Sequence, residues 1–297
     1  MISAKEAGFL LLTSKLGDPD RPVLTTAQLR TLGQRMQNME RPSEDRDVTA
    51  EDLMGLGYSR DSARRILHLL EETDVLEHYL RRAERMGCIP ISRVNPGYPG
   101  ILKDKLGLEA PGCLWMKGDL SILDTPMIAL VGSRDIATEN KAFAAEVGRQ
   151  AALQGYTLVS GNARGADRTA QSACLKTGGR VVSVVADSLA QKTLQSRVLY
   201  VSEEDFDGEF SAQRALRRNR IIHTLGSKTF VAQSGFGYGG TWDGTQKNLQ
   251  NGWSPVFCFR DGSDGSVQLS QLGANLIRME DLRDLAALEA SQKSLFA

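Results

Sequence analysis

The pattern of apolar and polar positions changes character near residue 120. Before that point, apolar residues recur at helical spacing between polar connectors. This spacing predicts helices over 24–37, 48–58, 59–73 and 75–87. Thr49 stands three positions before Asp52, an arrangement typical of a capping box at the start of a helix. The first part of the chain is therefore predicted to be a small helical domain, with a charged, proline-containing loop over 38–47.

The stretch from 88 to 123 is rich in proline and glycine, which interrupt regular structure. It predicts a short strand, turns and an extended connector. From Pro126 onward, short apolar runs alternate with helical segments. The runs that predict strands cover 127–133, 156–161, 180–186, 228–233, 254–259 and a last short one at 274–278. The helical segments between and after them cover 139–155, 166–179, 212–226, 245–252 and 280–292.

Strands that alternate with helices along the chain are typical of a parallel sheet covered by helices on both faces. We therefore predict an α/β fold, a Rossmann-like doubly wound, mainly parallel sheet with a small N-terminal helical domain. The predicted organisation is a helical domain over 1–88, an extended connector over 89–120 that packs on the next domain, a Rossmann-like domain over 121–282, and a C-terminal helical tail over 283–297.

Three loops of the predicted sheet combine glycine with hydroxyl or basic side chains. They are Gly132-Ser133-Arg134, the segment Ser160–Asp167 and the segment Ser234–Thr245. Each follows a predicted strand, so all three are expected at the carboxyl edge, where open parallel sheets bind ligands. Glycine lets the backbone approach a ligand, and the next helix start favours an anion. Neither GxGxxG nor GxxxxGK[ST] occurs, which disfavours an ordinary dehydrogenase or P-loop ATPase.

A cluster of arginines occupies the predicted helix 212–226, at positions 214, 217, 218 and 220. Two of these side chains can share one helix face, and the others must splay. Guanidinium groups suit phosphate because they bind it with two parallel hydrogen bonds. The acidic stretch 202–209 just before the helix supports an alternative, in which the arginines belong to a solvated charge patch.

Charge and composition narrow the class of protein. The 36 basic and 36 acidic side chains balance, which argues against a surface that is basic all over but leaves room for a local basic groove. The four cysteines include no CxxC pair, so we expect no metal, no cofactor and a reduced cytoplasmic chain. No apolar run is long enough to cross a membrane, and no secretory signal is recognisable.

Three blocks of sequence resemble the DNA-processing protein A (DprA/Smf) family. They are "ALVGSR" at 129–134, "LVSGNARGADRTAQSACLKTGG" at 158–179 and "RRNRIIHTL" at 217–225, with "YPGILKDKLGLEAPGCLWMKGDLSIL" at 98–123 ahead of them. The family pattern is GSR, then SG-x-ARG-x-D-x-x-AH, then RNR-I-I, and the similarity covers about residues 97–259. The N-terminal helices correspond to the family's variable small helical domain, of the SAM or helix-hairpin-helix kind.

The resemblance implies a non-enzymatic protein of DNA recombination and DNA uptake that binds single-stranded DNA in a basic pocket. It further implies a homodimer and a RecA-type recombinase as partner. Arg134, Arg164, Arg218 and Arg220 become the candidate phosphate ligands. The complete set of predicted DNA- or phosphate-binding residues is Gly132, Ser133, Arg134, Ser160, Gly161, Arg164, Gly165, Arg218, Asn219, Arg220, Gly240 and Thr241.

Departures from the family pattern keep other functions open. Gln171 replaces the usual His, Ala186-Asp187-Ser188 replaces a glycine-containing loop, and Gln233-Ser234 replaces Glu-Ala. We also expect the chain to lack the family's C-terminal winged-helix domain. The alternatives are a DprA-like protein recruited to phage defence or to a toxin–antitoxin role, a protein-binding antitoxin or regulator that binds a toxin, and a nucleotide-sensing or nucleotide-processing protein of the LOG-like superfamily. For the last, no Glu stands near Gln246 in the matching glycine loop, so hydrolase chemistry is disfavoured.

Three further side chains have a structural and a functional interpretation. Asp167 is expected to cap the helix that it opens or to pair with Arg164, rather than to bind a ligand. His223 stands among apolar residues and is expected to pack in a helix rather than to act as a general base. Trp242 is the candidate for stacking on a DNA base, with a lid folded over the glycine loop as the alternative.

Overall fold

The structure is a computed structural model that describes residues 2–37, 47–203 and 205–290. The chain divides into two compact units. The first comprises the residues up to Tyr98 together with Pro111–Trp115, Glu203 and Asp205, and the second comprises Pro99–Ala110 and most of the chain from Met116 on. The segment 89–120 thus contributes to both units. The boundaries predicted from the sequence stay predictions.

The first unit is helical, as the periodicity predicts. Its elements are α1 (Ala4–Thr13), α2 (Thr26–Gln37), α3 (Ala50–Gly55), α4 (Arg60–Glu71), α5 (Thr73–Arg85) and strand β1 (Ile89–Ser92). The apolar faces of α1 to α4 meet in a core built around Leu53, Ile66 and Leu69. The capping box predicted at Thr49 and Asp52 is confirmed, since each side chain accepts the other's backbone N–H. The loop predicted over 38–47 lies almost entirely outside the described residues.

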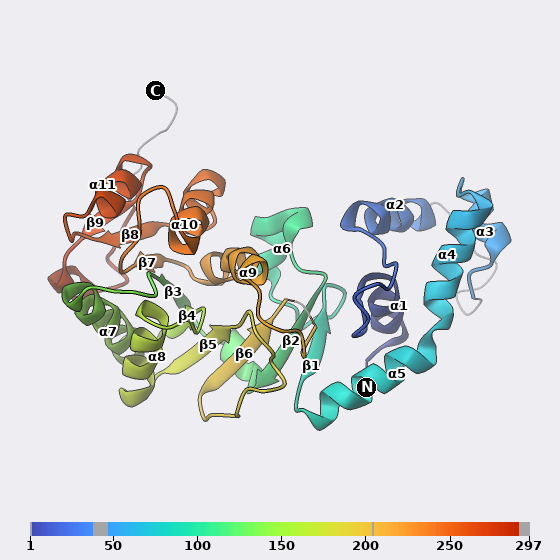
Figure 1. Ribbon diagram of the computed structural model, residues 1–297, viewed down its shortest axis with the longest axis horizontal. Helices are drawn as coiled ribbons and strands as arrows, with labels where there is room; N and C mark the ends of the chain where they lie inside the picture. Colours follow the sequence, from blue (N-terminus) through green and yellow to red (C-terminus); the bar gives the residue numbers. More distant parts are fainter. Residues whose placement is uncertain (1, 38–46, 204, 291–297) are drawn as a thin grey trace. The chain divides into compact units, whose positions relative to one another are not determined.

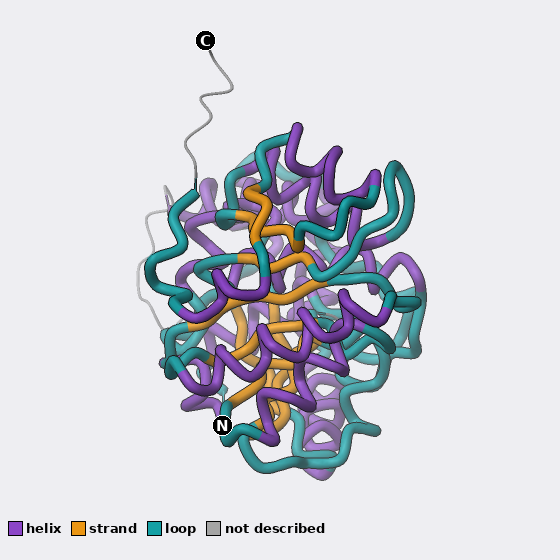
Figure 2. The backbone as a smooth tube through the Cα atoms, turned by 90° about the vertical axis from the view of Figure 1, so that its left-hand side faces the viewer, coloured by secondary structure: helices purple, strands orange, loops and turns teal. Residues whose placement is uncertain are grey.

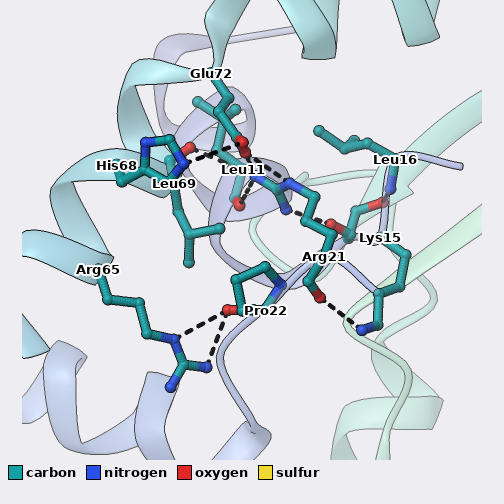
Figure 3. Close-up of polar contacts among 10 residues, drawn as sticks. Leu11, Lys15, Leu16, Arg21, Pro22, Arg65, His68, Leu69 and Glu72 are labelled. Atoms are coloured by element: carbon teal, nitrogen blue, oxygen red, sulfur yellow. Dashed lines mark hydrogen bonds and ion pairs between the residues drawn. The ribbon is translucent and has the colours of Figure 1, made fainter. Parts of the chain in front are cut away.

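A buried arginine joins the ends of two helices in this unit (Figure 3). The Arg21 guanidinium donates to the carbonyls of Leu11 (2.7 Å) and Ser14 (2.5 Å) near the end of α1. Its Nε donates to Glu72 Oε2 (2.7 Å), which follows the end of α4. Helix ends leave carbonyls without intrahelical partners, and a cation there also suits the helix dipole. Arg21 both donates to these helix-end carbonyls and places a positive charge at the negative end of the helix dipole.

The second unit contains most of the sheet. Its helical segments are α6 (Gly100–Leu106), η1 (Gly107–Glu109), η2 (Leu120–Asp124), α7 (Thr138–Leu153), α8 (Ala166–Lys176), α9 (Ala212–Leu225), α10 (Gly240–Asn251), α11 (Asp264–Gln271) and η3 (Met279–Arg283). Its strands are β3 (Met127–Val131), β4 (Thr157–Ser160), β5 (Arg180–Val184), β6 (Val198–Ser202), β7 (Thr229–Val231), β8 (Val256–Phe259) and β9 (Asn275–Ile277), with part of β2 (Cys113–Gly118).

The strands are hydrogen-bonded in the order β1-β2-β6-β5-β4-β3-β7-β8-β9, and every pair from β6 to β9 is parallel. They form a layer with helices on both sides (Figure 2). Helices α7 and α8 pack together against one face, whereas α9 packs against the other together with α10 (Figure 1). The predicted doubly wound parallel sheet is confirmed. Every residue of β3 is buried, which explains why this strand is an unbroken apolar run.

Several parts of this unit differ from the sequence-based expectation, and helix α11 is one that was not predicted. Strand β6 was not predicted, because its five buried residues stand between a turn-rich segment and an acidic loop that hide the short apolar run. The helix predicted over 280–292 shrinks to the short η3, and residues 284–290 continue as turns and irregular chain. The remainder of the predicted tail, 291–297, lies outside the described residues. In the described ranges no helix has the length and apolar character needed to cross a bilayer.

We expect Arg21→Met to destabilise the helical unit by about 3 kcal/mol, because it leaves two helix-end carbonyls and a carboxylate without their buried donor. The matched control is Arg65→Met. Arg65 is exposed and donates to the carbonyls of Pro22 and Val23, so its loss should cost less than about 1 kcal/mol. Urea unfolding of the full chain followed by circular dichroism measures both. Equal losses in the two variants would contradict the role given to Arg21.

Candidate functional site: the carboxyl edge of the parallel sheet

The sheet has a topological switch point between β3 and β7. The chain leaves β3 through α7 on one face, and it leaves the neighbouring strand β7 through α10 on the other face. Loops after such strands diverge and leave a crevice at the carboxyl edge. The three loops selected from the sequence follow β3, β4 and β7, which are adjacent strands. The structure therefore brings the predicted loops to one place.

Gln233 joins these loops. Its carbonyl accepts from the backbone N–H of Ser133 (3.0 Å) and from Ser133 Oγ (3.2 Å). Its Oε1 accepts from the N–H of Ala137 at the start of α7 (2.8 Å). Ser133 in turn accepts, through its own carbonyl, from the N–H of Ala166 at the start of α8 (3.2 Å). Gln233 departs from the family pattern, and its hydrogen bonds connect the loop after β7 to the loop after β3 and to the start of α7.

Three helices begin at this edge without a side-chain cap: α7 after Ala137, α8 after Gly165 and α10 after Gly239. In the same unit, Ser211 and Ser263 cap α9 and α11 with their hydroxyl groups. The first N–H groups of a helix carry partial positive charge and favour an anion where no other acceptor takes them. At α8 the N–H groups of Ala166 and Arg168 already donate to the carbonyls of Ser133 and Ala163. Gly165 adopts φ +86°, and a Cβ there would overlap the carbonyls of Ser133 and Arg134.

Asp167 lies beneath the loop that follows β4. It is 5% exposed, and its carboxylate accepts from the N–H of Ala163 (3.1 Å) and from that of Gly161. Burial raises the pKa of Asp167, and the positive charge of Arg218 is the largest influence that opposes this rise. The carboxylate therefore shapes the loop and does not face a ligand, but it does not cap α8 as predicted, because the start of that helix has no side-chain cap. The predicted pairing with Arg164 is wrong, because Arg164 pairs with Asp135 instead.

Arg218 is not at the surface, which corrects its prediction as a phosphate ligand. It is 7% exposed, and its guanidinium donates to the carbonyl of Gly161 (2.9 Å) and to Asn219 Oδ1 (2.7 Å). A Cβ at Gly161 would overlap this guanidinium, so a larger residue there would displace Arg218 from its present position. Arg218 thus holds α9 against the loop after β4, and its charge acts on Asp167 from the interior.

The other arginines of α9 splay as helical geometry requires. Arg214 stands one turn before Arg218 on the same face, is buried and donates to the carbonyl of Glu209 (2.6 Å). Arg220 is half-buried and donates to the carbonyls of Glu109 (3.1 Å) and Arg217 (2.6 Å). The expectation that Arg220 binds phosphate stays a prediction; in this structure its guanidinium is held by the η1 segment.

The exposed basic groups of the edge come from the loops. Arg134 is exposed, with its guanidinium 5.7 Å from the ring centroid of Phe210. Arg164 is also exposed and pairs with the exposed Asp135 at 2.6 Å. Arg168, which the sequence analysis did not select, is exposed in the first turn of α8 and donates to the carbonyl of Asn162 (3.3 Å). Its position two residues after the start of a helix that begins at the carboxyl edge was the feature of the sequence that could have identified Arg168.

Ser133 and Ser160, both predicted to bind phosphate, differ in how far they are buried. Ser133 is half-buried at the edge. Ser160, by contrast, is fully buried and accepts from Gln171 Nε2 (2.7 Å), so it does not line the surface as predicted. Gln171 is buried too, which places the substitution of the family's His in the interior and away from solvent.

The glycine-rich loop after β7 is attached to α9 through Asn219, whose Nδ2 donates to the carbonyl of Gly240 (3.0 Å). Gly240 and Thr241 are half-buried where α10 begins. Trp242 is only 9% exposed and meets Phe236 edge-to-face, with ring centroids 5.3 Å apart. The prediction that Trp242 stacks on a base is therefore corrected, because the residue is buried.

The interior behind this loop contains a neutral histidine. His223 is fully buried, and burial lowers its pKa to about 3, helped by the charge of Arg218. Its Nδ1 lies 3.2 Å from Asn248 Nδ2 and 3.3 Å from Thr229 Oγ1. The structural role predicted for His223 agrees with this position. Among the described residues, no three His, Cys, Asp or Glu side chains are grouped to hold a metal ion.

The fold and this edge define a doubly wound α/β protein whose adjacent glycine-rich loops carry exposed arginines. The chain belongs to the DNA recombination-mediator protein A family, whose model matches residues 90–287. The resemblance inferred from the three sequence blocks is thus confirmed.

Curated relatives carry the same family signature. The chain is 31% identical over 182 residues to DNA processing protein DprA of Streptococcus pneumoniae, which covers 57% of this chain and 64% of that protein. It is 27% identical over 212 residues to DprA of Bacillus subtilis, covering 66% of this chain and 69% of that protein. The match therefore spans slightly less than two thirds of the Streptococcus pneumoniae relative.

Two solved structures share the fold. The crystal structure of DprA from Streptococcus pneumoniae superposes with a TM-score of 0.73 at 24% identity, covering 98% of this chain and 99% of that one. DNA processing protein A from Helicobacter pylori superposes with a TM-score of 0.55 at 23% identity, covering 66% of this chain and 94% of that one. At these identities the similarity establishes the fold.

We expect Arg218→Met to destabilise the protein by about 3 kcal/mol at neutral pH, with a loss that grows as the pH rises. Burial already raises the pKa of Asp167, so the stability contributed by this group falls as the pH rises above the ordinary Asp value of 3.8. Removing the Arg218 charge raises the pKa of Asp167 further, so the loss of stability with rising pH becomes larger.

Urea unfolding at about pH 4.5 and pH 8 measures this effect, with Arg217→Met as the control because Arg217 is exposed on the same helix. A loss that is the same at both pH values would contradict the coupling between Arg218 and Asp167.

Proposed function

We propose that this protein binds single-stranded DNA at the carboxyl edge of its sheet and acts in DNA processing and recombination by binding rather than by catalysis. The observation that carries the proposal is the convergence of three uncapped helix starts with exposed arginines at one switch point. The Helicobacter pylori protein that shares the fold has a described single-stranded DNA binding mode, which supports the same ligand here.

The phosphate backbone supplies the chemistry that this edge recognises. The N–H groups at the starts of α7 and α10 and the guanidinium groups of Arg134 and Arg164 are donors, and phosphate is a strong acceptor. The candidate ligands are therefore Arg134, Arg164 and Arg168, with the backbone from Gly132 to Ser133, at Gly165 and from Gly240 to Thr241. Arg218, Gly161 and Ser160 support the edge from the interior.

Arg164 is poised to exchange partners. Its ion pair with Asp135 is formed between two exposed side chains, and such pairs contribute only about 0 to 1 kcal/mol. A phosphate that takes the place of Asp135 can accept two hydrogen bonds from the guanidinium. Releasing Asp135 therefore costs little, and Arg164 acts as a phosphate ligand when DNA arrives.

We expect the full chain to bind a fluorescent oligo-dT with an affinity that falls as salt rises, because phosphate binding releases counterions. Arg134→Ala and Arg164→Ala should each weaken binding at low salt by about 1.5 to 3 kcal/mol. Each should also reduce the slope of log K against log salt by about 0.7, the value for one single-strand phosphate contact. Anisotropy titrations over a range of salt concentrations give both quantities.

The matched control is Arg149→Ala. Arg149 is exposed and holds an ion pair with Glu146 near the far end of α7, away from the carboxyl edge, so its removal should leave binding and the salt slope unchanged. If the wild type shows no binding at low salt, or if the Arg149 variant loses as much as the Arg164 variant, the proposed site is wrong.

The expected partners beyond DNA stay predictions. Sedimentation of the purified chain tests the homodimer, and a pull-down with a RecA-type recombinase, with and without oligo-dT, tests the recombinase.

A further inference from the structure

Exposed aromatic side chains in the described residues are confined to one region. They are Phe210, Phe236 and Tyr238, with exposed fractions of 55%, 51% and 74%. Phe210 lies just before α9 and beneath the Arg134 guanidinium. Phe236 and Tyr238 belong to the loop after β7, which we call the aromatic loop (Gly235–Gly239). All three therefore lie at the edge to which the proposed function assigns the phosphate backbone.

The aromatic loop is anchored at both ends to that edge. On its near side, Gln233 holds Ser133 and the start of α7. On its far side, the carbonyl of Gly240 accepts from Asn219, and a Cβ added at Gly240 would lie 3.2 Å from Leu216, another exposed apolar side chain. The rings therefore continue the edge rather than lying on a separate surface.

The two rings are held in place although they are exposed. Phe236 stands edge-to-face on the buried Trp242, which supports it from the interior. Tyr238 lies over Gly235, where a Cβ would overlap its ring, so the glycine makes room for it. Gly237 and Gly239 adopt φ +74° and +88° and bear no side chain that would cover the rings. Each ring presents an apolar surface to solvent.

We propose that Phe236 and Tyr238 form a stacking platform for nucleobases, a subsite that extends the phosphate crevice and rests on the proposed function. Single-strand binding commonly combines a positively charged track for the backbone with aromatic rings on which bases stack. Every base has a π-face, so such a platform accepts single-stranded DNA of any sequence. The occupant is therefore the bases of the same strand whose phosphates meet Arg134 and Arg164.

The test compares two fluorescent oligomers of equal length and charge, oligo-dT and an oligomer in which every nucleotide is abasic. The wild type should bind oligo-dT at least about fivefold more tightly, since stacking on one ring is worth that factor or more. The double variant Phe236→Leu/Tyr238→Leu keeps apolar bulk but has no ring. It should lose the preference for bases and bind the abasic oligomer as the wild type does.

Two further variants sharpen the result. Tyr238→Phe keeps the ring and should keep the preference. Leu153→Ala changes an exposed apolar side chain at the far end of α7 and should alter neither affinity. Because the substituted side chains are exposed, the melting temperature of each variant should stay near that of the wild type, which separates loss of binding from loss of fold.

The outcomes distinguish this inference from the proposed function. If the wild type binds neither oligomer, the phosphate crevice itself is refuted. If it binds both oligomers equally and with the expected salt dependence, the crevice stands and the stacking platform is overturned. Unchanged DNA binding by the double variant, together with a loss of self-association on a sizing column, would overturn the platform in favour of a contact with a second copy of the chain.

Discussion

The buried guanidinium of Arg218 is the interaction on which the carboxyl edge depends. It links α9 to the carbonyl of Gly161, and its charge reaches Asp167, whose carboxylate takes the N–H groups of the loop after β4. A buried charge is tolerated only where hydrogen bonds and an opposite charge replace water. This cluster meets that condition, and its hydrogen bonds anchor the loop that carries Arg164.

The arginines have different roles, some structural and some available for a ligand, and the direction in which each points from its helix or loop decides which. A helix turns by about 100° per residue, so the four arginines of α9 cannot face one way. Arg214 and Arg218 point inward and hold neighbouring segments, while Arg220 is held by Glu109. The arginines left for a ligand therefore come from the loops and the first turn of α8, next to helix starts that no side chain caps.

Much of this protein was predictable where local chemistry decides the outcome. The unbroken apolar runs indicated the buried parallel strands, and the glycine loops after β3, β4 and β7 indicated the binding edge, because parallel strands end together. The short strand β6 and the lost C-terminal helix were mispredicted. Pairing within the sheet makes a strand of the five residues of β6. Near the C-terminal end, Leu282 and Leu285 are buried in η3 and the turn after it, so tertiary packing there selects tight turns where periodicity predicts a helix.

The fold class, the family and the three loops could be inferred from the amino-acid sequence, because periodicity and contiguous motifs encode them. Which side chains of those motifs reach solvent became clear only from the folded chain. Arg218, Ser160 and Trp242 belong to the selected motifs yet are buried, whereas Phe236 and Tyr238 are exposed on a loop that glycine leaves bare. Burial depends on segments distant in the chain, such as Gly161 against α9, and no local pattern records those contacts.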